Sequence, residues 1–182
     1  RAPRDARIAM IINQRHDIHH VRERGYVEAP VRIKALKHEL RKIDVFRNLR
    51  PRRFPDSHVL AVHDRKFVRF LERMCKSMPV GKTVYPSIFP SRNKTRVPDD
   101  PEVYAGYYCI DTFTPVQRNA WYAARRAVDC ALTGASELLS GTRLAYAMVR
   151  PPGHHAERRA FGGFCYLNSA AIAANFLARK GR

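Results

Sequence analysis

The stretch from Arg150 to Ala174 reads RPPGHHAERRAFGGFCYLNSAAIAA and carries most of the evidence for the fold of this chain. It follows residues 144–149 (LAYAMV), an apolar run that predicts a buried strand. Two prolines and a glycine then form a stiff turn, and His154 and His155 come directly after it. Because open parallel α/β sheets bind ligands at the carboxyl ends of their strands, we expect the histidine pair to lie at a ligand site.

The residue types in this stretch suit proton transfer beside a narrow slot. Adjacent imidazoles can act near neutral pH as a base and a positioned donor. Gly162 and Gly163 allow a ligand to approach the backbone closely, and Phe164 is placed to form a wall of the slot. The purely structural alternatives are a hydrogen-bonded core histidine, core packing for Phe164 and a buried small hydrophobe for Cys165.

Outside this stretch, the first half of the chain predicts a strand followed by helices. Residues 7–13 (RIAMIIN) predict a first buried strand. Asp64, or an earlier Asp56 or Ser57, is the candidate N-cap of a later helix. Another helix is predicted to open at Pro30, with these apolar residues on one buried face: Ile33, Leu36, Leu40 and Ile43.

The second half predicts two more helices around the strand at 144–149. Thr114–Gln117 has the pattern of a helix N-terminus, and the helix is expected to run to about Leu139. Asn168 or Ser169 caps a last helix that Gly181 closes. The order of elements predicts an α/β fold in which a parallel sheet is flanked by helices.

Residues 79–101 interrupt this order with a proline-rich loop that contains five prolines. A loop of this length inside a compact domain is usually functional or part of an interface. Tyr85 and Phe89 are its candidate apolar anchors, although local packing against the domain is an equal alternative.

The composition of the chain limits the kinds of partner that it is expected to bind. The chain has 182 residues, 45% of them hydrophobic, and a net charge of +18 that lies mostly in its first half. That hydrophobic fraction is enough for one domain with a core. No apolar run is long enough to span a membrane or to form the core of a signal peptide, so a cytoplasmic location is expected. No recognition-helix or zinc-finger pattern accompanies the basic residues, so nucleic acid is not the expected partner. The four cysteines form no CxxC pair and are expected to be reduced thiols.

At this point a family resemblance is clear. The segment RPPGHHA, followed by GGFCYLNSAAIAA, resembles the histidine-pair segment of the zinc-dependent histone deacetylase and acetylpolyamine amidohydrolase superfamily. Residues 28–32 (EAPVR) resemble the start of the family's first helix, and residues 63–71 resemble its next helix. The loop that ends in residues 105–109 (AGYYC) resembles the acetylpolyamine amidohydrolase branch. The resemblance implies an arginase/deacetylase-like sheet.

The resemblance also implies roles for individual residues. His155 would be the general base and then the general acid, with His154 as its electrostatic partner. The carbonyl of Gly163 would accept the substrate amide N–H, and Phe164 would line the tunnel. Arg32 matches a family arginine at the foot of the tunnel, and Glu102 matches an acidic residue near its mouth. Phe113 stands where the polyamine branch has a second acidic residue.

One feature of the family does not occur in these 182 residues. Its zinc ligands, two aspartates and a histidine, come from a DxDxHH-like strand and a later loop, and neither is present. We therefore predict that residues 1–182 form the N-terminal part of a single deacetylase-type domain, with no metal ligands of their own. His16, Asp17, His19 and His20 are not expected to form a substitute metal site, because solvated loop residues, or side chains that pack beside a site without binding the ion, are the more common case.

The predicted function is zinc-dependent removal of acetyl groups from acetylpolyamines or acetyl-lysine, as part of a longer chain. The 182 residues alone are expected to be inactive, and the 79–101 loop is a candidate homodimer contact. The alternative is a truncated, non-catalytic homologue or a basic binding module.

Overall fold

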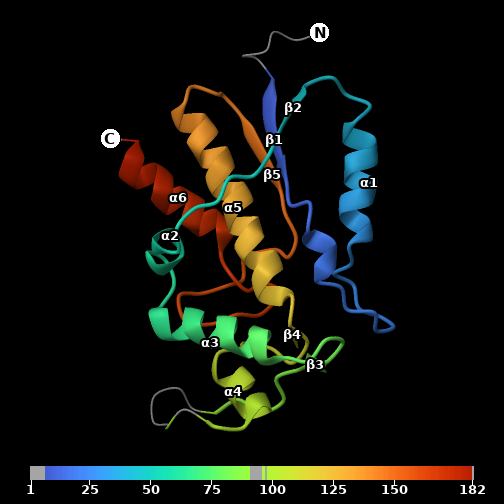
Figure 1. Ribbon diagram of the computed structural model, residues 1–182, viewed down its shortest axis with the longest axis vertical. Coiled ribbons are helices and arrows are strands. Elements are labelled where there is room, and N and C mark those ends of the chain that lie inside the picture. Colours follow the sequence, from blue (N-terminus) through green and yellow to red (C-terminus); the bar gives the residue numbers. More distant parts are fainter. Residues whose placement is uncertain (1–6, 91–95, 97, 182) are drawn as a thin grey trace.

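A parallel three-stranded sheet organises the chain in the computed structural model, which describes residues 7–90, 96 and 98–181. Strand β1 (Ile8–Ile12) is central, with β2 (Phe46–Leu49) on one side and β5 (Ala145–Met148) on the other. Both pairings are parallel. The predicted parallel α/β fold with flanking helices is therefore confirmed (Figure 1).

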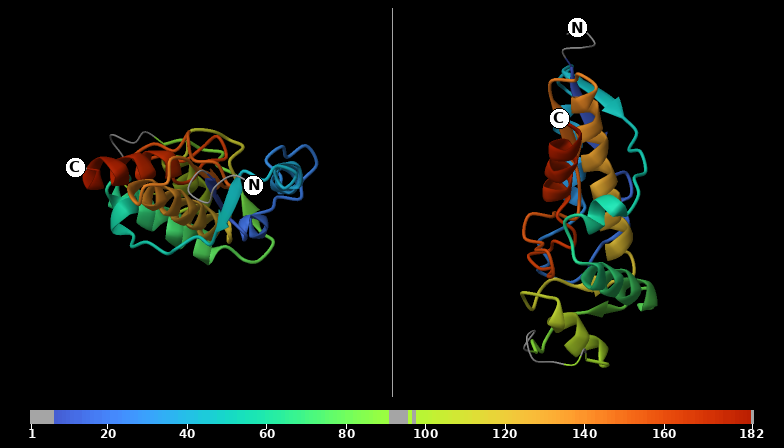
Figure 2. Two further views of the ribbon diagram at one scale, coloured as in Figure 1. Left: turned by 90° about the horizontal axis from the view of Figure 1, so that it is seen from above. Right: turned by 90° about the vertical axis from the view of Figure 1, so that its left-hand side faces the viewer.

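Strand β1 is apolar throughout because both of its faces are covered. Ala9 and Ile11 pack with Cys130 of helix α5 (Ala120–Leu139), whereas Met10 and Ile12 pack with Ile33 of helix α1 (Val31–Leu40). Alternate residues of a strand point to opposite faces, so α5 and α1 lie on opposite sides of the sheet (Figure 2). Helix α6 (Ser169–Lys180) packs against α5.

Strand β2 was not predicted from the sequence. It contains Arg47 and Asn48 between two half-buried apolar residues, so it lacks the apolar run of a central strand. Among the described residues β2 pairs with β1 alone, and its Asn48 is exposed, so this strand keeps a polar side chain in contact with water.

Two helix predictions need correction. Leu36 and Ile43 are 42% and 51% exposed, so α1 buries only Ile33 of its expected face and ends at Leu40. Residues Val116–Gln117 form strand β4, which pairs antiparallel with β3 (Thr83–Val84), and α5 begins only at Ala120. Thr114 does not cap a helix because its hydroxyl donates to Asp111 Oδ2 (2.9 Å) and accepts from the Phe164 N–H (2.9 Å).

Helices α3 and α4 begin at side-chain caps. Asp64 accepts hydrogen bonds from the backbone N–H groups of Lys66 and Phe67, as predicted, and starts α3 (Arg65–Ser77). Asp100 does the same for α4 (Pro101–Tyr107), and a short helix α2 (Ser57–Leu60) precedes α3. A 3-10 turn, η1 (His16–Ile18), follows β1. Within the described residues, no helix is both long and apolar enough to cross a bilayer.

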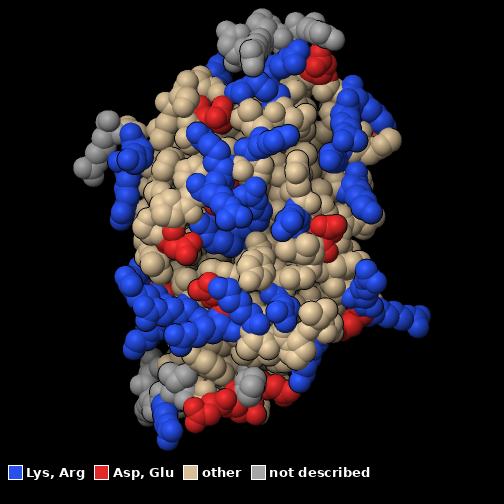
Figure 3. Space-filling model, in the orientation of Figure 1, with Lys and Arg blue, Asp and Glu red and all other residues tan. Residues whose placement is uncertain are grey.

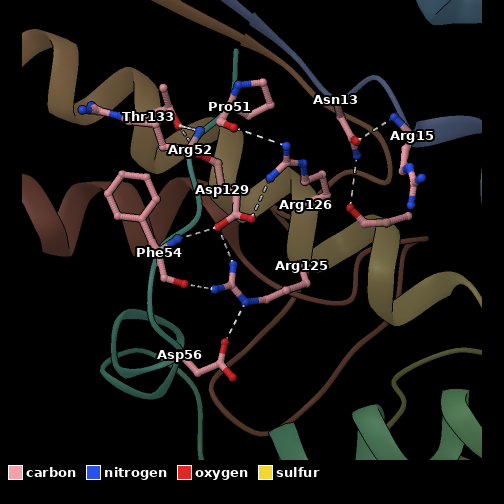
Figure 4. Close-up of polar contacts among 11 residues, drawn as sticks. Asn13, Arg15, Pro51, Arg52, Phe54, Asp56, Arg125, Arg126, Asp129 and Thr133 are labelled. Atoms are coloured by element: carbon pink, nitrogen blue, oxygen red, sulfur yellow. Dashed lines mark hydrogen bonds and ion pairs between the residues drawn. The ribbon is translucent and has the colours of Figure 1, made fainter.

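The segment after β2 is bound across α5 by charged and polar contacts (Figure 4). The buried Asp129 carboxylate accepts from the Phe54 N–H (3.1 Å) and pairs with Arg125 (2.8 Å) and Arg126 (3.2 Å). Arg125 also pairs with Asp56 at 2.8 Å. Residues of this segment and of α5 therefore neutralise one another's charges locally.

A buried histidine makes the stability of this fold depend on pH. His19 is fully buried, and burial is the main reason that its pKa falls to about 3, with the positive charge of Arg150 adding to the effect. The folded state therefore holds His19 neutral, whereas the unfolded chain protonates it below its ordinary value near 6.5. We expect the free energy of unfolding to fall by up to about 1.4 kcal/mol per pH unit between pH 6.5 and pH 3 from this residue alone.

Urea unfolding of the whole protein at a series of pH values measures this slope. His19→Phe should reduce the slope, and His20→Phe, at the exposed neighbouring position, is the matched control that should retain it. Equal slopes in the wild type and in His19→Phe would contradict the assignment.

Candidate functional site

The histidine pair lies where β5 ends. After β5, the chain passes a cis Arg150–Pro151 bond, and His154 and His155 then sit exposed with their ring centroids 4.3 Å apart. The turn before them needs a glycine, because a Cβ on Gly153 would lie 2.9 Å from the backbone nitrogen of Ser169. This close contact joins the histidine turn to the start of α6.

A second turn, at Gly162–Phe164, lies against the ring of His155. Gly163 and Phe164 both have positive φ (56° and 62°), and the His155 ring lies against Gly163. A Cβ on Gly163 would come within 2.7 Å of Cγ of His155, so glycine is needed here for space as well as for conformation.

The side chain of Asp111 holds this turn in place. Its Oδ2 accepts from the Gly163 N–H (2.5 Å), and its Oδ1 accepts from the N–H groups of Phe113 (3.0 Å) and Thr114 (2.7 Å). Sequence reasoning missed Asp111, although an aspartate three residues before a threonine is the pattern of a side-chain-stabilised turn. Asp111 therefore fixes the 111–114 turn relative to the backbone beside His155, because its side chain is hydrogen-bonded to both.

These elements border an open cleft of about 520 Å³ between α1, β5 and the two turns. The cleft contains the predicted residues His154, His155, Gly163, Phe164 and Arg32 among its lining. Glu102 is not part of the lining and lies exposed on α4. Phe113 is half-exposed and packs its ring 5.2 Å from that of Phe164, whose other ring neighbour is Tyr26 at 5.3 Å.

Arg150 ties the histidine turn to the loop between β1 and α1. It is 2% exposed, and its guanidinium donates to the carbonyls of His16 (2.6 Å), His19 and Glu28 (2.9 Å). Its Nε lies 2.7 Å from Oε1 of the buried Glu28. Burial raises the pKa of Glu28, and Arg150 opposes that rise.

Sequence reasoning assigned no role to Arg150, although a charged residue between a buried strand and Pro-Pro-Gly was a usable indication. Its contacts also explain part of the His-rich loop, because two carbonyls of that loop accept from this guanidinium.

No metal-binding set forms in the part of the chain that the structure describes. None of its His, Cys, Asp and Glu residues come together in groups of three or more that could hold an ion, and this includes the loop from His16 to His20. The residues of the cleft therefore do not constitute a zinc site on their own. What they offer is a pair of imidazoles, a backbone carbonyl and an apolar wall.

The fold and this cleft define a class of protein. Residues 26–182 match the histone deacetylase domain, and the chain belongs to that family. Among individual relatives, it is 34% identical over 158 residues to the acetylpolyamine amidohydrolase of Mycoplana ramosa, covering 85% of this chain and 46% of that protein. It is 41% identical over 139 residues to the acetylpolyamine amidohydrolase of Burkholderia pseudomallei, covering 70% and 39%.

A solved structure agrees with these relatives. The crystal structure of the acetylpolyamine aminohydrolase from Burkholderia pseudomallei matches with a TM-score of 0.82 at 34% identity, covering 95% of this chain and 53% of that one. The predicted superfamily and branch are thus confirmed. The chain spans about half the length of the relatives it matches.

Substitution of Gly163 tests whether the close contact with His155 matters. Gly163→Ala should lower activity of the whole protein at least about tenfold, because the new methyl group must displace the His155 ring. Gly25→Ala is the matched control, since Gly25 also has positive φ (86°) but has no atom within 4 Å of the place that its methyl group would take. Release of acetate, which we propose below as the activity of the whole protein, measures both. Equal losses in the two variants would show that backbone strain, rather than the contact, causes the effect.

Proposed function

We propose that this chain is part of a deacetylase, an amide hydrolase that releases acetate from acetylated amines such as acetylpolyamines. The observation that supports it best is the arrangement of His155, which is exposed in the cleft, lies beside His154 and rests on Gly163 in a deacetylase-family domain. The names of the relatives support the acetylpolyamine class of substrate.

The histidines would carry the proton transfers. In this proposal His155 removes a proton from the attacking water and returns it to the leaving amine. The neighbouring His154 ring acts as a donor or as a positive charge beside the developing negative charge. Both side chains belong to one short turn, so their relative position is set by the backbone.

The second turn would orient the acetylated chain. The Gly163 carbonyl already accepts a weak hydrogen bond from Sγ of Cys165 (3.3 Å), and its second lone pair remains for the substrate amide N–H. Phe164, flanked by Phe113 and Tyr26, would provide an apolar wall for the methylene chain that carries the amide.

Zinc belongs to the proposal as the cofactor of the whole protein. When bound, it would polarise the amide carbonyl. Because the described residues do not form a ligand set, the ligands would come from the part of the relatives' length that this chain does not span.

The direct test is acetate release by the protein with its complete deacetylase domain. We expect hydrolysis of a mono-acetylated diamine, and weaker hydrolysis of an acetyl-lysine peptide, with loss of both after chelation and recovery on adding zinc. Failure to release acetate from either substrate in the presence of zinc would overturn the proposal.

Glu102 is the residue that we expect to contribute to the preference for polyamines. Glu102 does not line the cleft of this chain, but the family resemblance implies a position near the tunnel mouth. An exposed carboxylate there would attract a cationic chain, so Glu102→Gln should lower kcat/KM for a mono-acetylated diamine about two- to fivefold. A neutral acetylated amine should be cleaved at an unchanged rate. Equal losses on the charged and the neutral substrate would show that Glu102 acts through the structure of α4 instead.

The homodimer contact of the 79–101 loop stays a prediction, and residues 91–95 and 97 lie outside the described part. Tyr85 is engaged locally, since its hydroxyl donates to Glu23 (2.7 Å). In the described part of the loop, the large apolar residues that remain for a partner are Val80, Ile88 and Phe89, which are 84%, 54% and 44% exposed.

A further inference from the structure

A cleft between α3 and α4, separate from the histidine cleft, is lined by cations and aromatic rings. It encloses about 460 Å³, and no carboxylate contributes to its lining. Its lining residues are Lys66, Arg69, Phe70, Arg73, Met74, Ser77, Tyr104 and Tyr108. A hollow of this size with several like charges is suited to a small anionic ligand.

The three cations come from one face of α3. Lys66, Arg69 and Arg73 are spaced at i, i+3 and i+7, so they share a face, and the rise of about 1.5 Å per residue separates the two arginines by about 6 Å along the axis. The helix holds five basic residues and one acidic residue, Glu72, which pairs with Lys76 at 2.6 Å. Lys and Arg side chains form a band over α3 in Figure 3.

These three cations have no ion-pair partner among the residues that the structure describes. Asp64, two residues before Lys66, caps the helix and accepts from the Lys66 and Phe67 N–H groups. Aromatic rings complete the lining: Phe70 of α3 packs 4.5 Å from Tyr104 and 4.6 Å from Tyr108, measured between ring centroids. The cations of the lining therefore all come from α3.

A larger basic cleft on the α5 face provides the contrast. It encloses about 890 Å³ and also contains arginines, but Arg125 and Arg126 pair with Asp129, and Arg125 also pairs with Asp56 (Figure 4). The positive charges of Arg125 and Arg126 are therefore already paired with carboxylates of the protein. The α3–α4 cleft is the smaller of the two, yet its arginines are available to a ligand.

We propose that the α3–α4 cleft binds a small ligand that carries at least two phosphate groups. Arginine guanidinium groups match phosphate geometry with two parallel hydrogen bonds, and more than one negative charge is needed to balance three cations. The phosphates can come from an inorganic chain or from a nucleotide, and the two sources share this chemistry.

Calorimetric titration of the whole protein with inorganic tripolyphosphate tests the proposal. We expect saturable binding at one site, weakened at least about tenfold in Arg69→Gln/Arg73→Gln. The matched control is Arg41→Gln/Arg143→Gln, which removes the same charge from exposed positions at the other end of the sheet and should change the affinity less than about twofold. Thermal melts of both variants confirm that they fold.

Further titrations distinguish a nucleotide from an inorganic phosphate chain, and a specific site from diffuse attraction by charge. Tighter binding of ATP than of tripolyphosphate, without added metal, identifies a nucleotide, and equal binding identifies the phosphate chain as sufficient. Equal weakening in the two double variants would overturn the proposal in favour of diffuse attraction by net charge. Absence of saturable binding, or binding of a long DNA duplex alone, would overturn it as well.

Discussion

Replacing His155 by alanine is expected to lower kcat for acetate release by a factor of about 10² to 10⁴. The reason is that the proposed base and acid is lost at the one position where an imidazole rests on Gly163 and faces the cleft. Steady-state assay of the protein with its complete domain, on a mono-acetylated diamine, gives the number. A variant that retained the full rate would remove His155 from the proposed chemistry.

Two companion variants make the result specific. His154→Ala removes the neighbouring ring, which the proposal gives a supporting role, so its loss should be smaller than that of His155→Ala. His20→Ala removes an exposed histidine that does not line the cleft, and it should keep the wild-type rate. A larger loss at His154 than at His155 would exchange the two assigned roles.

Replacing Arg150 by methionine is expected to lower the free energy of unfolding by about 3–5 kcal/mol. The substitution leaves the buried Glu28 carboxylate without its counter-charge, and it removes the donor from three backbone carbonyls of the β1–α1 loop. Urea unfolding of the whole protein at neutral pH measures the change.

The double-mutant cycle with Glu28 identifies the cause. Glu28→Gln/Arg150→Met removes both charges, so it should be more stable than Arg150→Met alone. Arg143→Met, at an exposed position, is the surface control and should change stability by less than about 0.5 kcal/mol. If Arg150→Met and Arg143→Met were equally stable, the buried pair would have no structural importance.

Elements with a strong local pattern could be predicted from the sequence. The apolar runs gave β1 and β5 to within a residue or two. Asp64 and Asn168, each one of the candidates for its position, are the caps of α3 and α6, and such caps can be found locally because a cap acts through hydrogen bonds within its own turn. Among the site residues, the histidine pair and Gly163–Phe164 lie close together in sequence and were found together in the cleft.

Elements that depend on distant partners could not be predicted in this way. Thr114 has the local pattern of a helix cap, but Asp111 and the backbone of Phe164 use its hydroxyl, and β4 forms because β3 lies beside it. The role of Asp111 likewise depends on Gly163, 52 residues further along the chain.

The sequence by itself determined the α/β class, the order of most elements and the deacetylase-type histidine turn, since each rests on side chains that act within a few residues of one another. Only the tertiary structure decided that β2 is a strand and that Arg150 binds Glu28 in the β1–α1 loop. It also decided that Lys66, Arg69 and Arg73 border a cleft between α3 and α4. The physical reason is the same in each case. Pairing of an outer strand, burial of an ion pair and the shape of a cleft depend on surfaces that meet only when the chain has folded.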